Sequence, residues 1–243
     1  PPEKARETRA TSPDGGQSAK AQMAPMAEKA PRAESPSPSG AKYVNADDLS
    51  CKSGERVSCA LAGRPVDGLV GVDDADERGR KYLKTLYKFS GGYPTEVALN
   101  LLPNGRVKRI VSFADGYREG PTLTYYDKAS PEGDYLPESL VFYARGQRDG
   151  MSFSLDEGGR LTTVVDSYSQ GKINGVVCSL YPDGSVRSLQ EYAKGDPLGR
   201  SEEFSQGERS SDYHWAPSVM DDAMREIGRA ARPLMRELRA IQR

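Results

Sequence analysis

The amino-acid sequence predicts an all-β fold: an elongated, single-layer antiparallel sheet of repeated β-hairpins. Three observations lead to this prediction. A motif of one aromatic residue and two glycines recurs about every 24 residues, apolar and polar residues alternate after each copy, and a tight turn follows the alternation. A disordered N-terminal tail and a C-terminal amphipathic helix are expected to flank this sheet.

The repeated motif reads aromatic-x-x-Gly-x-x-x-Gly. Four copies are complete, whereas a fifth, FSGGYPTE, keeps the aromatic and the first glycine but ends in Glu96. Because no Gly-Lys-Ser/Thr follows these glycines, we interpret them as turn and packing residues and not as a phosphate-binding loop. The repeat-structural residues are the aromatics Phe89, Phe113, Tyr143, Tyr168 and Tyr192, the first glycines Gly92, Gly116, Gly146, Gly171 and Gly195, and the second glycines Gly120, Gly150, Gly175 and Gly199.

A strand with one buried face is expected after each motif. Apolar residues three and five positions beyond the second glycine position enclose a polar residue, and turns such as LPNG and YPDG then reverse the chain. The first glycines are 24, 30, 25 and 24 residues apart, the longest interval having an enlarged turn around 130–133. The array therefore covers 64–207 in about six units. The residues expected to point inward are Leu99, Leu101, Leu123, Tyr125, Phe153, Leu155, Cys178 and Leu180.

The chain before the array has two parts. Residues 1–42, rich in Pro, Ala, Ser and Lys, predict a disordered tether. A lead-in segment, 43–63, carries Cys51 and Cys59, which we expect to form a disulfide in an oxidising compartment; the alternative is two free cytosolic thiols. Since the sequence starts at Pro1 and not at methionine, we expect that a signal peptide, an anchor or another segment was removed.

Residues 208–243 predict a capping helix with one apolar stripe and a basic opposite side. Ser218 and Asp221 are expected to cap its start, and Pro233 to kink or split it. The stripe fits three roles: covering the sheet, pairing in a homodimer, or lying with the arginines on an anionic membrane. Its residues are Met220, Met224, Ile227, Ala231, Leu234, Leu238 and Ile241.

Composition argues against several functions. The balance of 34 Lys+Arg against 35 Asp+Glu disfavours nucleic acid as a partner, and one histidine with three cysteines disfavours a zinc site. We expect no cofactor, no metal and no enzyme activity.

His214, beside Ser210, Ser211 and Asp212, is interpreted as part of the cap. The acidic run at Asp73, Asp74, Asp76 and Glu77 is interpreted as a solvated turn, with calcium binding or glycan hydrolysis as alternatives.

The repeated motif with its following strand and Pro-Asp/Asn-Gly turn resembles the MORN repeat family, and in particular its bacterial variant branch, which includes antitoxin-labelled proteins. The resemblance covers about residues 64–207. It implies an elongated sheet of hairpins and a role in protein contact, scaffolding or lipid association. The Glu-Trp of the commoner MORN pattern is missing, and the single tryptophan, Trp215, lies outside the array.

These observations favour a non-catalytic protein-binding or scaffolding repeat protein, tethered to or exported to the bacterial cell envelope or periplasm. Tyr117, Tyr126 and Tyr181 are the candidate binding residues, because tyrosine offers a large contact area at low entropic cost. The expected partner is another protein, with peripheral membrane or cell-wall association as a further expectation. The alternative is a cytoplasmic antitoxin-like protein that neutralises a toxin, and a cell-wall-acting enzyme is the least favoured function.

Overall fold

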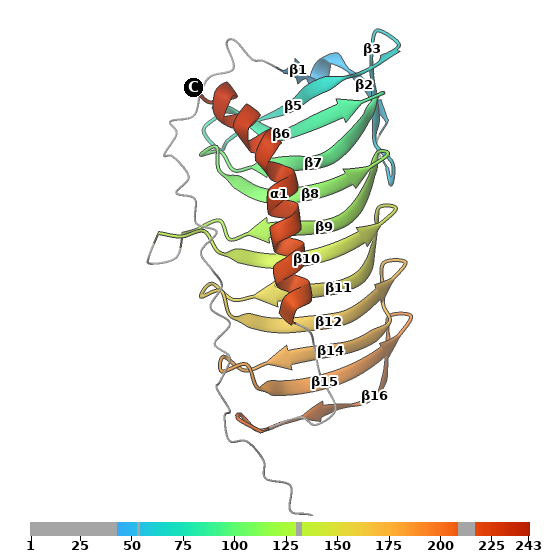
Figure 1. The fold of residues 1–243 in the computed structure, drawn as a ribbon, viewed down its shortest axis with the longest axis vertical. Helices are drawn as coiled ribbons and strands as arrows, with labels where there is room; N and C mark the ends of the chain where they lie inside the picture. The colour runs from blue at the N-terminus through green and yellow to red at the C-terminus, as the bar shows by residue number, and fades with distance from the viewer. Residues whose placement is uncertain (1–42, 53, 130–132, 209–216) are drawn as a thin grey trace, which may run out of the picture.

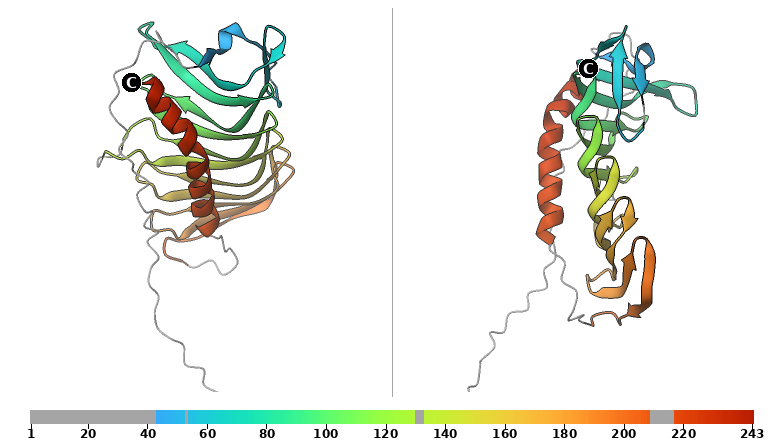
Figure 2. Two further views of the ribbon diagram at one scale, coloured as in Figure 1. Left: turned by 45° about the horizontal axis from the view of Figure 1, so that its top comes forward. Right: turned by 90° about the vertical axis from the view of Figure 1, so that its right-hand side faces the viewer.

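A computed structural model describes residues 43–52, 54–129, 133–208 and 217–243, and it confirms the predicted fold class. Consecutive antiparallel hairpins form one 13-stranded sheet, and α1 (Pro217–Ile241) runs across the strands on one face (Figures 1 and 2). The sheet consists of β1 (Val44–Asn45), β5 (Gly68–Ala75), β6 (Lys81–Ser90), β7 (Tyr93–Leu101), β8 (Val107–Ala114), β9 (Tyr117–Tyr125), β10 (Pro137–Ala144), β11 (Gln147–Leu155), β12 (Leu161–Ser169), β13 (Lys172–Ile173), β14 (Gly175–Leu180), β15 (Val186–Ala193) and β16 (Asp196–Glu203).

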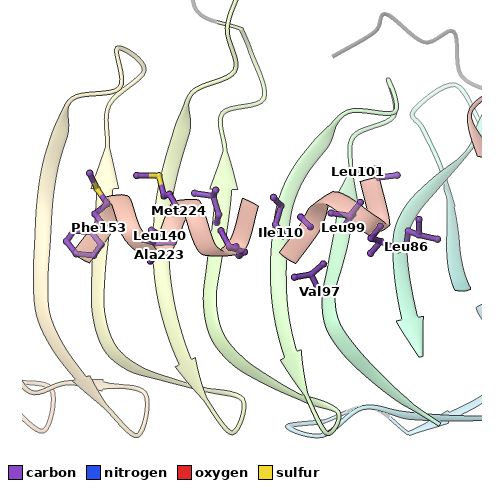
Figure 3. Close-up of a cluster of buried hydrophobic side chains, with 14 of the residues drawn as sticks. Leu86, Val97, Leu99, Leu101, Ile110, Leu140, Phe153, Ala223 and Met224 are labelled. Atoms are coloured by element: carbon purple, nitrogen blue, oxygen red, sulfur yellow. The ribbon is translucent and has the colours of Figure 1, made fainter. Parts of the chain in front are cut away.

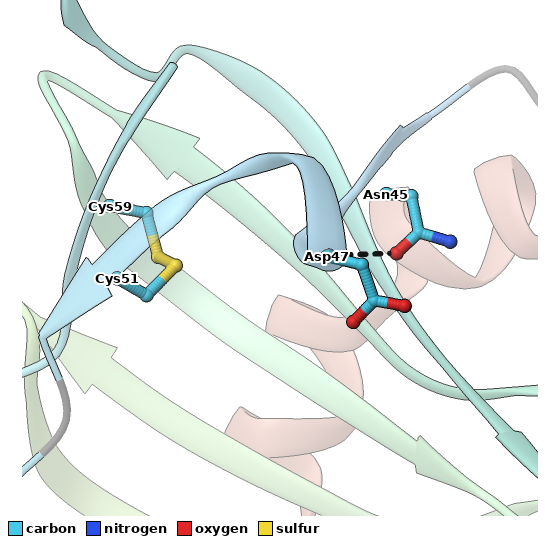
Figure 4. Close-up of a disulfide and its surroundings, with 4 residues drawn as sticks. All are labelled: Asn45, Asp47, Cys51 and Cys59. Carbon is cyan, nitrogen blue, oxygen red and sulfur yellow. Dashed lines mark hydrogen bonds between the residues drawn. A yellow bond between two sulfur atoms is a disulfide. The ribbon is translucent and has the colours of Figure 1, made fainter. Parts of the chain in front are cut away.

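The lead-in segment forms a short 3-10 helix, η1 (Ala46–Asp48), and a second, small sheet. This sheet has three strands: β2 (Ser50–Lys52), β3 (Ser58–Leu61) and β4 (Arg64–Pro65). Asn45 caps η1, its side-chain oxygen accepting a hydrogen bond from the Asp47 backbone N–H (Figure 4). β1 pairs with β5 in parallel, so the lead-in segment joins the large sheet at its first edge. The predicted tether, residues 1–42, lies outside the described residues.

The first glycine of each motif closes a two-residue hairpin turn. At Asp115–Gly116 both residues have positive φ, 49° and 83°, and the pairs ending in Gly146, Gly171 and Gly195 repeat this geometry. Positive φ at both central positions defines a type I′ turn, whose twist matches that of the flanking strands. Glycine takes the second position because it adopts positive φ without steric cost.

The second glycine of the motif has a different structural role, because it lies inside the next strand and not in the turn. It faces the aromatic residue of the following unit: Gly120 is paired with Tyr143, and Gly150 with Tyr168. In the incomplete copy, Glu96 faces Phe113 and keeps the positive φ of a glycine, 61°. Each motif therefore forms one half of a joint between neighbouring units.

The main core lies between the sheet and α1. One residue from each of nine strands, β6 to β12, β14 and β15, joins a central column that crosses the sheet, and most of this column is fully buried. Figure 3 shows Leu99, Ile110, Leu140 and Phe153 of this column, with Met224 of the helix. Seven of the eight residues expected to point inward belong to this core or pack against it, and the eighth, Leu155, is also buried. The column contains Leu86, Leu99, Ile110, Leu123, Leu140, Phe153, Val164, Cys178 and Leu189.

The helix agrees with its predicted stripe but differs at two details. Met220 through Leu238 of the stripe are buried against the sheet, so the stripe covers the sheet. The helix begins at Pro217, one residue before the expected cap at Ser218, which suits proline's preference for the first helical position. Pro233 does not split the helix, which is continuous to Ile241. None of the described helices is long and apolar enough to span a membrane.

Candidate functional site

The face opposite α1, called the outer face below, carries two ordered sets of side chains. The repeat aromatics form one set, the aromatic column, near the two-residue turns. The other set, the polar row, consists of the residues next in sequence to the central column, which therefore point to the opposite side. Paired strand by strand, the polar row reads Thr85, Asn100, Arg109, Thr124, Ser139, Ser154, Thr163, Ser179 and Ser188.

The aromatic column is covered at its first end and accessible further along. Phe89 is only 3% exposed and forms a second small core with Cys59, Val66 and Val70. Tyr143, Tyr168 and Tyr192 are half-buried instead. The lead-in segment thus shields the first aromatic of the column.

Arginines lie over the accessible tyrosines. The Arg118 guanidinium is 5.7 Å from the centre of the Tyr143 ring, and that of Arg148 is 5.5 Å from the Tyr168 ring. Burial alone would lower the pKa of Arg148, but its hydrogen bonds with the Tyr143 and Tyr168 hydroxyls outweigh burial and raise it. Aromatic and cationic groups therefore lie side by side on this part of the outer face, at distances typical of cation–π pairs.

Four residues of the polar row are hydrogen-bonded to one another in two pairs, whereas, in the described part of the chain, a residue beside the row has an unpaired hydroxyl. Asn100 donates to the Thr85 hydroxyl at 2.9 Å, and Arg109 donates to the Thr124 hydroxyl at 3.2 Å. Thr122 is 8% exposed, and its buried hydroxyl has no hydrogen-bond partner among the described residues.

Two of the three predicted binding tyrosines use their hydroxyl groups within the array. Tyr126 donates to the Leu155 carbonyl at 2.6 Å and Tyr181 to the Phe204 carbonyl at 3.0 Å. Each bond joins one hairpin to the next. Tyr117 lies at the two-residue turns, where the Arg56 guanidinium is 5.5 Å from its ring centre. The structure therefore does not bring the three tyrosines together into one patch.

Tyr126 also lines a shallow hollow of about 260 Å³ beside the enlarged turn. Inside it, the Lys108 amine forms ion pairs with Asp127 at 2.7 Å and Glu138 at 2.8 Å. Burial alone would lower the pKa of Lys108, but the two carboxylates outweigh burial and raise it. The charge of Lys108 is thus already neutralised by two carboxylates. Its lining is completed by Lys128, Ala129, Leu136 and Glu157.

The lead-in hairpin, β2 and β3, lies along the row of two-residue turns, an arrangement that the sequence reading missed (Figure 1). The Cys59 N–H donates to the Gly92 carbonyl and the Val57 N–H to the Gly116 carbonyl, each at 2.8 Å. These contacts are made by backbone atoms, which leave no side-chain pattern in the sequence. Arg56 adds a side-chain contact, its guanidinium lying 4.1 Å from the centre of the Tyr93 ring.

Cys51 and Cys59 face each other across this hairpin and are joined by a disulfide with an S–S distance of 2.07 Å (Figure 4). The bond closes the hairpin next to the turns that it contacts. Cys178, in the central column, is buried, and burial raises the pKa of its thiol to about 11. Such a thiol is protonated at neutral pH and poorly reactive.

The acidic run holds no unpaired carboxylate pair. Asp73 accepts hydrogen bonds from Tyr43 at 2.9 Å and Asn45 at 2.8 Å, while Asp74 pairs with Lys84 at 2.6 Å. Asp76 pairs with Arg80 at 2.7 Å and accepts from backbone N–H groups, which lower its pKa. In the described ranges no group of three or more metal-ligating side chains is found. His214 and its neighbours lie outside the described residues.

No protein-family model matches this chain, and no curated protein matches it either.

Proposed function

We propose that this protein is a non-catalytic binding protein that uses the outer face of its sheet to hold another protein. The proposal is supported mainly by the accessible part of the aromatic column. There Tyr143, Tyr168 and Tyr192 lie half-buried in a line, and arginines stack on two of these rings. Tyrosine and arginine are the side chains most enriched at binding hot spots. The resemblance of the motif to MORN repeats, a family linked to protein contact and scaffolding, supports the same function.

The partner is proposed to meet the outer face and not α1. The apolar stripe of α1 is buried against the sheet, so we do not propose a homodimer through it. Site-specific photocrosslinking in cells of the source organism tests the proposal. p-Benzoylphenylalanine at Tyr168 is expected to capture a protein, whereas the same group at Arg229, on the exposed side of α1, serves as the matched control. Equal capture from both positions, or none from Tyr168, contradicts the proposed function.

We also propose a location in the cell envelope, which the Cys51–Cys59 disulfide supports because such bonds persist in oxidising compartments. Thiol titration of unreduced, native protein is expected to find one thiol, and only after unfolding, since Cys178 is buried. Three free thiols contradict the envelope location and favour the cytoplasmic, antitoxin-like alternative.

A further inference from the structure

The row of two-residue turns, called the turn edge below, is partly occupied by the chain itself. Cys59 lies on the Gly92 turn and Val57 on the Gly116 turn, each through a backbone hydrogen bond. The backbone of Glu55 lies against Gly146: a Cβ added there would be 3.1 Å from the Glu55 carbonyl oxygen. Every second residue of an extended segment therefore meets one successive turn.

Two more turns continue the same row. Gly171 and Gly195 have φ of 81° and 94°, close to the values of the occupied turns. Their N–H groups donate to the preceding unit, at Arg148 and Ile173, as the Gly146 N–H donates to Arg118. Within the described ranges, no donor reaches the carbonyl oxygens of Gly171 and Gly195, and a Cβ on Gly171 would meet nothing within 4 Å.

The charge of the edge changes where the chain's own segment ends. At the occupied turns, Tyr93 and Tyr117 follow the glycine and receive the Arg56 guanidinium. The corresponding residue at the Gly171 turn is Lys172, which would repel an arginine. In the segments of the two unoccupied turns, 170–173 and 194–197, two basic side chains, Lys172 and Lys194, accompany one acidic side chain, Asp196.

We propose that an extended, acidic peptide segment of a partner protein binds along the turn edge over Gly171 and Gly195. Alternate backbone N–H groups of this segment donate to the two turn carbonyls, as Val57 and Cys59 do on the neighbouring turns. An acidic side chain at the position that corresponds to Arg56 pairs with Lys172, which follows Gly171 as Tyr93 follows Gly92. This inference rests on the proposed function and specifies the chemistry of its partner.

A labelled peptide tests the backbone pattern. Its sequence, Gly-Glu-Glu-Val-Ser-Ser, copies residues 54–59 with arginine replaced by glutamate and cysteine by serine. Fluorescence anisotropy with the full chain is expected to show binding. N-methylation at the valine and the last serine, the equivalents of 57 and 59, is expected to weaken binding at least about tenfold, because two hydrogen bonds are lost. N-methylation at the one serine between them, the equivalent of Ser58, is the control. No binding, or equal binding of the two methylated peptides, overturns the inference.

Two glycine variants test the location. Gly171→Ala and Gly184→Ala both place a methyl group at positive φ, 81° and 85°, with nothing within 4 Å. Gly184 belongs to a turn at the opposite edge, so both variants carry the same strain but only Gly171→Ala obstructs the peptide. We expect loss of peptide binding in Gly171→Ala alone, and weaker binding in Lys172→Glu. Equal binding by both alanine variants overturns the location.

The peptide-binding experiment and the photocrosslinking experiment at Tyr168 can be interpreted separately. Capture of a protein from Tyr168 without peptide binding removes this inference and leaves the proposed function standing. Peptide binding without any capture from Tyr168 contradicts the proposed function of the outer face and leaves the peptide site at the turn edge standing.

Discussion

The first hairpins and the last hairpin of the array share one motif but are covered very differently. Around β6 and β7, α1 lies on one face and the lead-in segment on the other, and Leu86 and Leu99 are fully buried. At the other end every residue of β16 is exposed, and Leu189 of the central column faces Glu202. The motif forms the strands, whereas two segments outside the repeats bury them. Stability is therefore expected to fall along the array.

The largest expected effect compares two leucines of the central column. Leu99→Ala removes a fully buried side chain next to α1 and is expected to cost about 3 kcal/mol of unfolding free energy. Leu189→Ala, at a half-buried position of β15, is expected to cost about 1 kcal/mol, because solvent fills the space. Urea unfolding of both variants measures the difference. Equal costs contradict a graded array.

The second comparison concerns the turn edge. Gly116→Ala and Gly171→Ala both place alanine at positive φ, which costs about 1–2 kcal/mol. On Gly116 the new methyl group also collides with the Val57 carbonyl, while on Gly171 it meets open space. Gly116→Ala is therefore expected to be about 1–3 kcal/mol less stable than Gly171→Ala, by the usual cost of overpacking. Matching melting curves mean that the lead-in hairpin does not hold the edge in solution.

A third variant repairs the incomplete motif. Glu96→Gly is expected to stabilise the protein by about 0.5–1 kcal/mol, because glycine adopts the observed φ of 61° without strain. The variant loses the ion pair with Lys88, but both side chains are about half exposed, at 49% and 47%, so the pair contributes little. Lys88→Ala controls for that loss, and thermal unfolding measures both. If Glu96→Gly does not raise the melting temperature, the backbone at position 96 is not the site of strain.

The smallest expected effect at neutral pH is that of a pH dependence near α1, which acts only in alkaline solution. Burial raises the pKa of Tyr125, which packs against the main core, from 10.0 to about 12. The folded state thus holds the phenol proton more tightly than the unfolded chain does. This contribution to stability is complete below about pH 10 and is lost as pH rises through about 12. Tyr125→Phe is expected to flatten the dependence of unfolding free energy on pH between about 10 and 12. If the variant unfolds in alkaline solution as the unchanged protein does, Tyr125 is not the group responsible.

Much of the fold was predictable because it follows from local patterns. Period-two alternation identified the inward residues, of which Leu99, Phe153 and Cys178 are fully buried, and the spacing of Met220 to Leu238 identified the helix stripe. The motif alone could not separate the roles of its two glycines. Gly116 lies in a turn and Gly120 in a strand opposite Tyr143, a difference that depends on the pairing between units.

The candidate site was less predictable. Tyr126 and Tyr181 were expected to offer their rings for binding, yet their hydroxyls bridge neighbouring hairpins, because each reaches a carbonyl of the next unit. The occupation of the turn edge by residues 55–59 depends on main-chain hydrogen bonds, which any sequence of suitable conformation makes. Side-chain contacts also join the two segments, since Arg56 stacks on Tyr93 and Gln147 donates to Glu55, but these pairs can be recognised only once the two segments are seen together.

The pairing of each second glycine with the next aromatic has an evolutionary consequence. Since each complete motif carries an aromatic that faces the unit before it and a glycine for the unit after it, a duplicated block of one repeat length brings both complementary halves of the joint. Such a copy would dock in register wherever it was inserted between two units. Gene duplication could therefore lengthen or shorten this array by whole hairpins, with adjustment needed only where α1 and the lead-in hairpin meet it.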